Sequence, residues 1–455
     1  MRAIYALMVV ASVGCNGGGG RTTSGADMAP APFTLAIADA ITLPTDPTVI
    51  KYPDDYQNAI AATVNVAVPY CAVKSPTVTF PKSWLGAFPL PAINGAPLPS
   101  TVPRGLHLKD YWTSGLHDAS TNSGCTGDLH DAYRETLRRA KLLGVDHIGF
   151  YQDAWPVDAS ATPPVFDVNI SEIPPAEIAF IVAEAKAQGL AVHEYMQINA
   201  GDHKGGQLPA DIPGSDWASK FLDSYTDFIV GQAAYAQQLG IDAFQLDWGA
   251  YFLEWNPPGH PDYAALLNQK MAIAAQKVRA AYSGKIIYGT LEPFVQADAS
   301  VFANVDWQLV DLYGVTLTAT ENDAISVALL KSKYVAFIHG HYQLYRRFAR
   351  PAVFRLYVQS HRNYLRDGWV EDGFCVPSAQ DCSQLQLTTD FSVQAIATEA
   401  MLEAITTQTD YSLAAVASQA WFYTDVIMPK SAQPNISQST RDKPAEAITY
   451  RWYKR

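Results

Sequence analysis

Charged residues are scarce in this chain, and basic ones most of all. Only 17% of its 455 residues are charged, and 32 Lys and Arg face 44 Asp and Glu, for a formal net charge of 32 − 44 = −12. An acidic chain with no run of Lys or Arg is a poor nucleic-acid binder, so we expect no nucleic-acid partner. Hydrophobic residues reach 48%. The chain can therefore bury a sizeable core, which excludes wholesale disorder.

Cysteine is also rare, with five residues in all. No CxxC motif or Cys/His metal spacing is present, which argues against a structural zinc site, and we predict no metal and no cofactor. Setting Cys15 aside leaves Cys71, Cys125, Cys375 and Cys382. An even remainder in an exported protein suggests disulfides, and four cysteines allow three pairings. The short polar loop between the last two favours pairing Cys375 with Cys382, and Cys71 with Cys125.

A long hydrophobic run is missing as well. The apolar stretch Ala3–Val13 follows Arg2 and is too short to span a bilayer as a mature helix, so it predicts a secretion signal. Gly14-Cys15 and the Gly-rich stretch after it resemble a bacterial lipoprotein signal, although Ser12 stands where such signals usually have Leu. The resemblance implies that Cys15 is lipidated. We expect an exported protein of the bacterial cell envelope, lipid-anchored and periplasmic or at the cell surface, with ordinary secretion as the alternative. Membrane contact would be through the anchor only.

After the expected signal, residues 1–15, the composition divides the chain into three parts. Residues 16–32 form a flexible Gly/Ser/Pro tether. Residues 33–100 are rich in Pro and β-branched residues, and the alternation in ATVNVAV and PTVTF predicts a few short strands or an extended wrap. From residue 101 to 455 short apolar runs alternate with helical patterns, which is typical of βαβ units.

Eight such strand-helix cycles fit the 455 − 100 = 355 remaining residues, and they predict an α/β fold, a (β/α)8 TIM barrel. The main rival is a doubly wound open sheet, but its glycine-rich phosphate fingerprint is missing after the first strand, where the sequence is KDYWTSG. The predicted strands are 104–112, 146–155, 190–197, 241–249, 285–294, 306–314, 334–342 and 419–429. The predicted helices are 128–144, 174–189, 215–240, 263–284, 324–333, 391–406 and 441–453.

Acidic residues stand at nearly every predicted strand end. In a TIM barrel the carboxyl-terminal ends of the strands form the mouth, where active sites are built. A single acid there could simply cap a helix or pair with a loop cation. Carboxylates crowded in a ring repel one another, and this repulsion raises the pKa of some of them. Such a difference suits glycoside hydrolysis, in which one carboxyl group is protonated and another is ionised. The polar strand-end residues are Asp110, Asp153, Glu194, Asp247, Glu292, Asp311, His339, His341 and Asp425.

Aromatic residues accompany these acids. They make up 11% of the chain, with 24 Tyr and 10 Trp, and Trp112, Trp155, Trp248 and Trp421 each lie within a few residues of a strand-end acid. Such a Trp can stack on the apolar face of a sugar ring, whereas the simpler interpretation is packing at the rim. The combination predicts a carbohydrate substrate.

The segment AFQLDWG resembles the one that ends in a nucleophilic Asp in retaining α-glycosidase barrels such as the α-amylase and α-galactosidase groups. The closing RDKPAEAITYRWY, after a Trp-rich strand, is similar to the last unit of several bacterial barrel glycosidases. The resemblance implies that Asp247 is the nucleophile. We favour Glu292 as acid/base, with Asp311 as the α-galactosidase-like alternative. No Asn-Glu pair ends the fourth strand and no Glu ends the seventh, so the large group that uses two such Glu residues fits poorly. Sugar hydroxyls would be bound by His107, Asp110, Asp153, Glu194, His339 and Asp425.

Two other functions compete with hydrolysis by a carboxylate pair. His339 and His341, with Asp425, could form a metal site as in barrel metallohydrolases, although such enzymes usually place the pair on the first strand, where this chain has only His107. A lipid-anchored, non-catalytic sugar-binding barrel would keep the aromatic rim without a matched acid pair. The sugar, its anomer, retention or inversion, and the oligomeric state are left open by the sequence.

Overall fold

The computed structural model describes residues 97–108, 133–198, 206–246, 259–289, 299–312, 315–367, 390–418 and 438–453, apart from short gaps within these ranges. They form two compact units. The first holds Tyr151–Glu184 and Val192–Leu309, and the second holds the described residues before Tyr151, Ala185–Ala191 and those from Val310 on. Across these ranges no helix has both the length and the apolar character needed to cross a membrane.

Within the described residues the chain forms a closed (β/α)8 barrel, which confirms the predicted fold class. The barrel strands follow one another around the sheet in chain order, and β1 pairs in parallel with both the second and the last, which closes the ring. β3 (Phe166–Ser171) is an added antiparallel partner of β2. The barrel strands are β1 (Arg104–Leu108), β2 (His147–Pro156), β4 (Ala191–Ile198), β5 (Ala243–Leu246), β6 (Lys285–Gly289), β7 (Trp307–Leu312), β8 (Ala352–Leu356) and β9 (Leu413–Ser418).

Helices follow the strands as predicted for most of the chain. The predicted helices 174–189 and 215–240 are confirmed, and each ends before a glycine, Gly189 or Gly240, whose backbone is left-handed with φ of 71° or 69°. Part of 133–141 is also helical. The remaining helices are α6 (Pro175–Ala187), α7 (Ser215–Leu239), α8 (Pro261–Ala281), α9 (Ala299–Phe302), α10 (Ala319–Asp323), α11 (Val327–Tyr345), α12 (Tyr364–Asp367), α13 (Phe391–Thr407) and α14 (Pro444–Tyr453).

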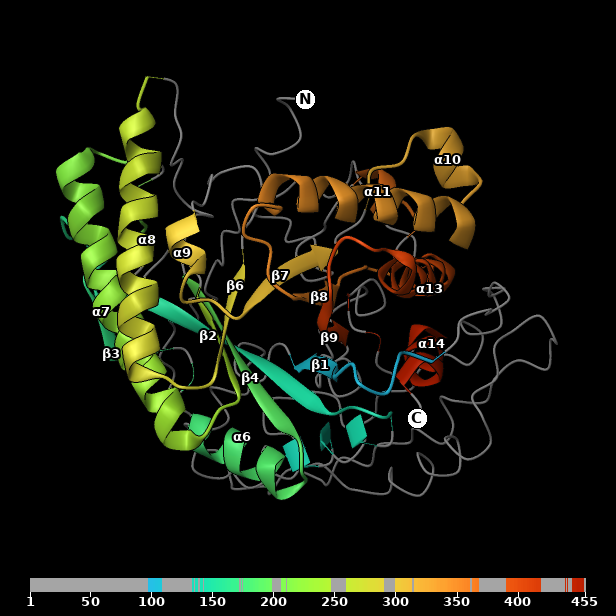
Figure 1. Ribbon diagram of the computed structural model, residues 1–455, viewed down its shortest axis with the longest axis horizontal. Helices are drawn as coiled ribbons and strands as arrows, with labels where there is room; N and C mark the ends of the chain where they lie inside the picture. Colours follow the sequence, from blue (N-terminus) through green and yellow to red (C-terminus); the bar gives the residue numbers. More distant parts are fainter. Residues whose placement is uncertain are drawn as a thin grey trace, which may run out of the picture. The chain divides into compact units, whose positions relative to one another are not determined.

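In the first unit the long helix α7 packs on β3 and on α8, which runs beside it in Figure 1. Its apolar face explains the packing on β3. Phe221, Tyr225 and Phe228 all contact the ring of Phe166, with centroids 5.7, 5.5 and 6.0 Å away. Because these four rings are buried, their contacts hold the added strand against the helix layer.

The predicted seventh strand, 334–342, is wrong, because these residues lie inside helix α11. The buried side chains of α11 recur every three or four residues, which is a helical period. Ser326 caps the helix by accepting a hydrogen bond from the Leu329 N–H at 3.3 Å. The seventh barrel strand is instead β8, which lies between the predicted strand 334–342 and the predicted helix 391–406. The residues that show the period are Leu330, Tyr334, Ile338, His341 and Tyr345.

The predicted eighth strand is also misplaced. The last barrel strand is β9, which begins at Leu413 and pairs with β8 and β1, whereas we had predicted a start at residue 419. Residues 419–429 lie outside the described residues. The prediction favoured their bulky aromatics, but the strand is built from small residues, LAAVAS, which fit where parallel strands are covered on both faces.

At the opposite end of the barrel, three aspartates that directly precede barrel strands tie each strand to the previous one. In each case Oδ2 accepts a hydrogen bond from a backbone N–H at or next to the start of the previous strand. The pairs are Asp146 with Arg104, Asp242 with Val192, and Asp306 with Ile286, at 3.1, 2.7 and 2.9 Å. Part of the acidic surplus of the sequence therefore serves the amino-terminal ends of the strands.

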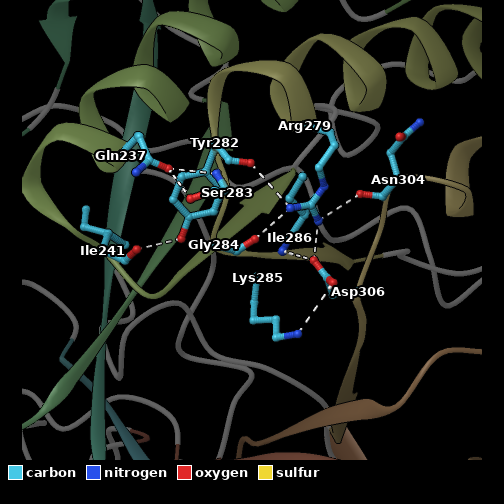
Figure 2. A network of polar contacts seen from close by, with 10 residues as sticks. All are labelled: Gln237, Ile241, Arg279, Tyr282, Ser283, Gly284, Lys285, Ile286, Asn304 and Asp306. Carbon is cyan, nitrogen blue, oxygen red and sulfur yellow. Dashed lines mark hydrogen bonds and ion pairs between the residues drawn. The ribbon is translucent and has the colours of Figure 1, made fainter.

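Figure 2 shows how one of these aspartates is neutralised in the first unit. Arg279, in the last turn of α8, donates to the Asp306 carboxylate and to the carbonyl oxygens of Gly284 at 2.8 Å and Asn304 at 3.3 Å. Lys285 adds a second cation 3.7 Å from Asp306. Two cations and a backbone N–H surround this carboxylate, so its role is structural.

Candidate active site

One ring contact in the first unit identifies the inner face of the barrel sheet. The ring centroids of His193 on β4 and Trp307 on β7 are 5.8 Å apart, although β5 and β6 separate these two strands in the sheet. Such a contact can form only between side chains that point into the barrel. Because side chains alternate along a strand, Tyr195, Leu309 and Asp311 share this inner face.

In the second unit the structure places a buried ion pair at the mouth. Both carboxylate oxygens of Asp311, near the end of β7, accept hydrogen bonds from Nε and Nη2 of Arg355, near the end of β8, at 2.6 Å each. The side chains of Arg355 and Asp311 are only 3% and 9% exposed. The Arg355 guanidinium carbon also lies 5.4 Å from the ring centroid of Tyr357. A bidentate, desolvated pair of this kind fixes the carboxylate in place and in direction.

Arg355 is not among the predicted site residues because β8 is not among the predicted strands. The signal was available: the run AVFRLYV follows Pro351 and has the length and the β-branched and aromatic content of a short buried strand. With β8 in place, the seventh strand ends in Leu356 and Tyr357. The prediction that no Glu ends this strand therefore still holds.

His107 also lies on the inner face. Gly105 and Arg355 both pair with Ala417 of β9, and residues that pair across a ladder share a face, so Gly105 and, two residues on, His107 point the same way as Arg355. His107 is fully buried and precedes the last residue of β1. The structure thus places His107 and Asp311 on the same face near the ends of their strands. The role of His107 in binding sugar stays a prediction.

Glu194 is not at the mouth, so that prediction is wrong. It follows His193 on β4 and therefore points to the outer face of the sheet. Its ladder partner Phe244 contacts the ring of Tyr282, which follows α8, at 5.9 Å between centroids. Burial and then the Glu194 carboxylate raise the pKa of the Tyr282 hydroxyl and that of Tyr235 on α7. Glu194 thus lies between the sheet and its helix layer.

Burial is also what perturbs Glu194 itself. The residue is 1% exposed, and no hydrogen-bond partner for its Oε1 occurs among the described residues. Desolvation of the charged form raises the pKa of Glu194 from 4.5 to about 8. The carboxyl group is therefore protonated at neutral pH, away from the site where it was expected to bind sugar.

His339 and His341 are misplaced in the same way, because both lie on α11 rather than on a barrel strand. His339 is exposed and its Nδ1 lies 3.2 Å from both oxygens of Asp410. His341 is buried, and its Nδ1 lies 2.9 Å from the hydroxyl of Tyr411. Burial lowers the pKa of His341 to about 4. Asp410 and Tyr411 lie three and two residues before β9, which begins at Leu413, so both histidines are near the amino-terminal ends of the strands. Two residues apart on a helix, they point to opposite sides of it. They cannot form the metal pair considered above.

Several predicted residues lie outside the described part of the chain. Asp153 and Trp155 belong to β2, but their side chains are not among those described. The others outside the described residues are Cys15, Cys71, Asp110, Trp112, Cys125, Asp247, Trp248, Glu292, Cys375, Cys382, Trp421 and Asp425.

No protein-family model and no curated protein sequence matches the chain. Solved structures with a similar fold include a complex described as a GH113 beta-1,4-mannanase, with 16% sequence identity and a TM-score of 0.51 over 78% of this chain and 98% of that chain. A second structure, also described as a GH113 beta-1,4-mannanase, has 15% identity with the same TM-score and the same coverage. At this identity the likeness shows the barrel fold alone.

Proposed function

We propose that the chain is a glycoside hydrolase that cleaves glycosidic bonds of an oligo- or polysaccharide with a pair of carboxylates at the mouth of the barrel. The observation that carries the proposal is the inward-facing Asp311 near the end of a barrel strand, at one of the strand ends where the sequence concentrates its acids. The similar fold of proteins described as mannanases supports it.

Asp247 is proposed as the nucleophile and Glu292 as the acid/base. The ion pair with Arg355 indicates that Asp311 and Glu292 have different roles. Both Asp311 oxygens already accept from the guanidinium, and a proton on either oxygen would remove the negative charge that strengthens these bonds. We therefore assign Asp311 to the orientation of groups at the mouth. Carbohydrate would be bound by the predicted residues, such as His107.

The test is hydrolysis by the mature protein of a panel of aryl glycosides and polysaccharides. β-Mannan stands first on the panel because the similar folds are described as β-1,4-mannanases. Turnover that is insensitive to a chelator supports the proposal. Turnover lost with a chelator and restored by a divalent metal would favour a metallohydrolase, and glycan affinity without turnover would favour a binding protein.

We also propose that the protein is exported and anchored through a lipid on Cys15. The support is the short apolar stretch before Gly14-Cys15 and the flexible segment after it. A Cys15→Ser variant that remains in the membrane fraction as the wild type does would contradict the anchor. For the other cysteines we propose the pairs Cys71–Cys125 and Cys375–Cys382, to be tested by mass mapping of unreduced peptides.

A further inference from the structure

Gln245, in the first unit, has a buried side-chain amide whose oxygen accepts no hydrogen bond from the described residues. It lies on β5 and is 4% exposed. Its Oε1 is buried and finds no hydrogen-bond partner among the described residues. A buried amide oxygen without a donor is unfavourable to keep, so a site of this kind calls for a partner other than the residues that the structure describes.

The amide of Gln245 lies against Gly289, the last residue of β6. A Cβ built on Gly289 would be 3.3 Å from Nε2 of Gln245 and 3.1 Å from Cδ2 of Leu309. Gln245 pairs in the ladder with Ile287, so Gly289 is one step nearer the mouth than that partner. The Gln245 side chain therefore leans toward the mouth, into room that only a residue without a side chain leaves open.

This amide is on the inner face of the sheet. Gly289 pairs with Leu309 of β7, and Leu309 shares its face with Trp307, whose ring meets His193 inside the barrel. The inner face near the strand ends is where TIM barrels bind their substrates. Gln245 also stands two residues before Asp247 in the sequence, the proposed nucleophile.

We propose that Gln245 is a substrate-binding residue whose amide oxygen accepts a hydrogen bond from a hydroxyl of the bound sugar. A neutral amide suits this task because it offers an acceptor and donors without adding to the negative charge of the mouth. Gly289 makes the contact possible by leaving room for the amide. The inference rests on the proposed function for its substrate class.

Gln308 is a matched control. It is fully buried, and neither of its amide atoms has a partner in the described part of the chain. It belongs to the outer face, since its ladder partner Tyr288 packs edge-on against Phe302 of α9 at 5.2 Å between centroids. Gln245→Leu and Gln308→Leu therefore remove the same group, one from the inner face and one from the outer face.

We expect Gln245→Leu to lower kcat/KM by about 10- to 100-fold, mainly through KM, and to weaken the binding of the hydrolysed oligosaccharide, measured by titration calorimetry, by a similar factor. Gly289→Ala, whose Cβ displaces the amide, should act in the same direction. Gln308→Leu should stay within about threefold in both measurements. Melting temperatures of the variants report any loss of folding. If Gln245→Leu does not fold, Gln245→Met, which keeps the length of the side chain and lacks the amide, should show the same loss.

The outcomes separate this inference from the proposed function. If the wild type binds oligosaccharides of the panel without hydrolysing any, the proposed function fails, and weaker binding by Gln245→Leu alone still supports the inference. If Gln245→Leu and Gln308→Leu have equal effects on binding and turnover, the inference is overturned. If the wild type binds none of the panel, both are overturned.

Discussion

Glu194 gives the free energy of unfolding an unusual dependence on pH. Burial raises its pKa from 4.5 to about 8, so between these values the folded chain keeps a proton that the unfolded chain releases. Stability from this group is fully present below pH 4.5 and is lost as the pH rises through 8. The loss is about 1.4 kcal/mol per pH unit, or (8 − 4.5) × 1.36, about 5 kcal/mol in all.

His341 acts in the opposite direction. Burial lowers its pKa from 6.5 to about 4, so below pH 6.5 the unfolded chain takes up a proton that the folded chain refuses. Stability from this group is lost as the pH falls, by (6.5 − 4) × 1.36, about 3 kcal/mol in all. Between pH 4.5 and 6.5 the two effects are equal and opposite, so the free energy of unfolding of the wild type should stay constant there.

Glu194→Gln should remove the loss of stability with rising pH that Glu194 causes and leave the gain that His341 causes. In the variant the free energy of unfolding should rise by about 3 kcal/mol from pH 4.5 to 6.5 and stay level up to pH 8. Near pH 8 it should exceed the wild-type value by about 5 kcal/mol. The assay is urea unfolding followed by tryptophan fluorescence at intervals of half a pH unit. Asp227→Asn is the control, because the Asp227 side chain is 80% exposed. Parallel pH profiles for wild type and Glu194→Gln would refute the reasoning.

The remaining predictions concern the two ends of the barrel. Asp306→Asn should lower the free energy of unfolding in urea by about 1–2 kcal/mol, since it weakens the bonds to Arg279 and the backbone, and leave kcat/KM unchanged. His339→Ala should keep the wild-type kcat/KM on the best substrate, because His339 lies near the amino-terminal ends of the strands. Asp311→Asn should lower kcat/KM by the same factor for aryl glycosides with good and poor leaving groups, whereas Glu292→Gln should spare the good ones, where protonation matters least. The opposite pattern would exchange the roles of Asp311 and Glu292.

The fold could be predicted from the sequence because its signals are local. Cycles of strand and helix, with glycines at helix ends, identify βαβ units without any knowledge of packing. The error at 334–342 came from an apolar, β-branched run, YVAFI, whose helical period becomes clear only over the whole of residues 327–345.

The site was harder to predict because it depends on which face of each strand points inward. Parallel strands in a barrel are buried on both faces, so hydrophobic alternation does not distinguish them. His193 and Glu194 are neighbours in sequence, yet one lies inside the barrel and the other under the helix layer. Asp311 was placed at the mouth from the end of its strand alone, whereas its partner Arg355 required the register of a strand that had been missed.

The most direct test of the proposed hydrolysis is the effect of Asp247→Asn on kcat/KM for the best substrate of the panel, with Asp227→Asn as control. If Asp247 is the nucleophile, its variant should lose on the order of 1,000-fold or more in kcat/KM while keeping the wild-type melting temperature, and the control should keep full activity. An Asp247→Asn variant with wild-type kcat/KM would contradict the account.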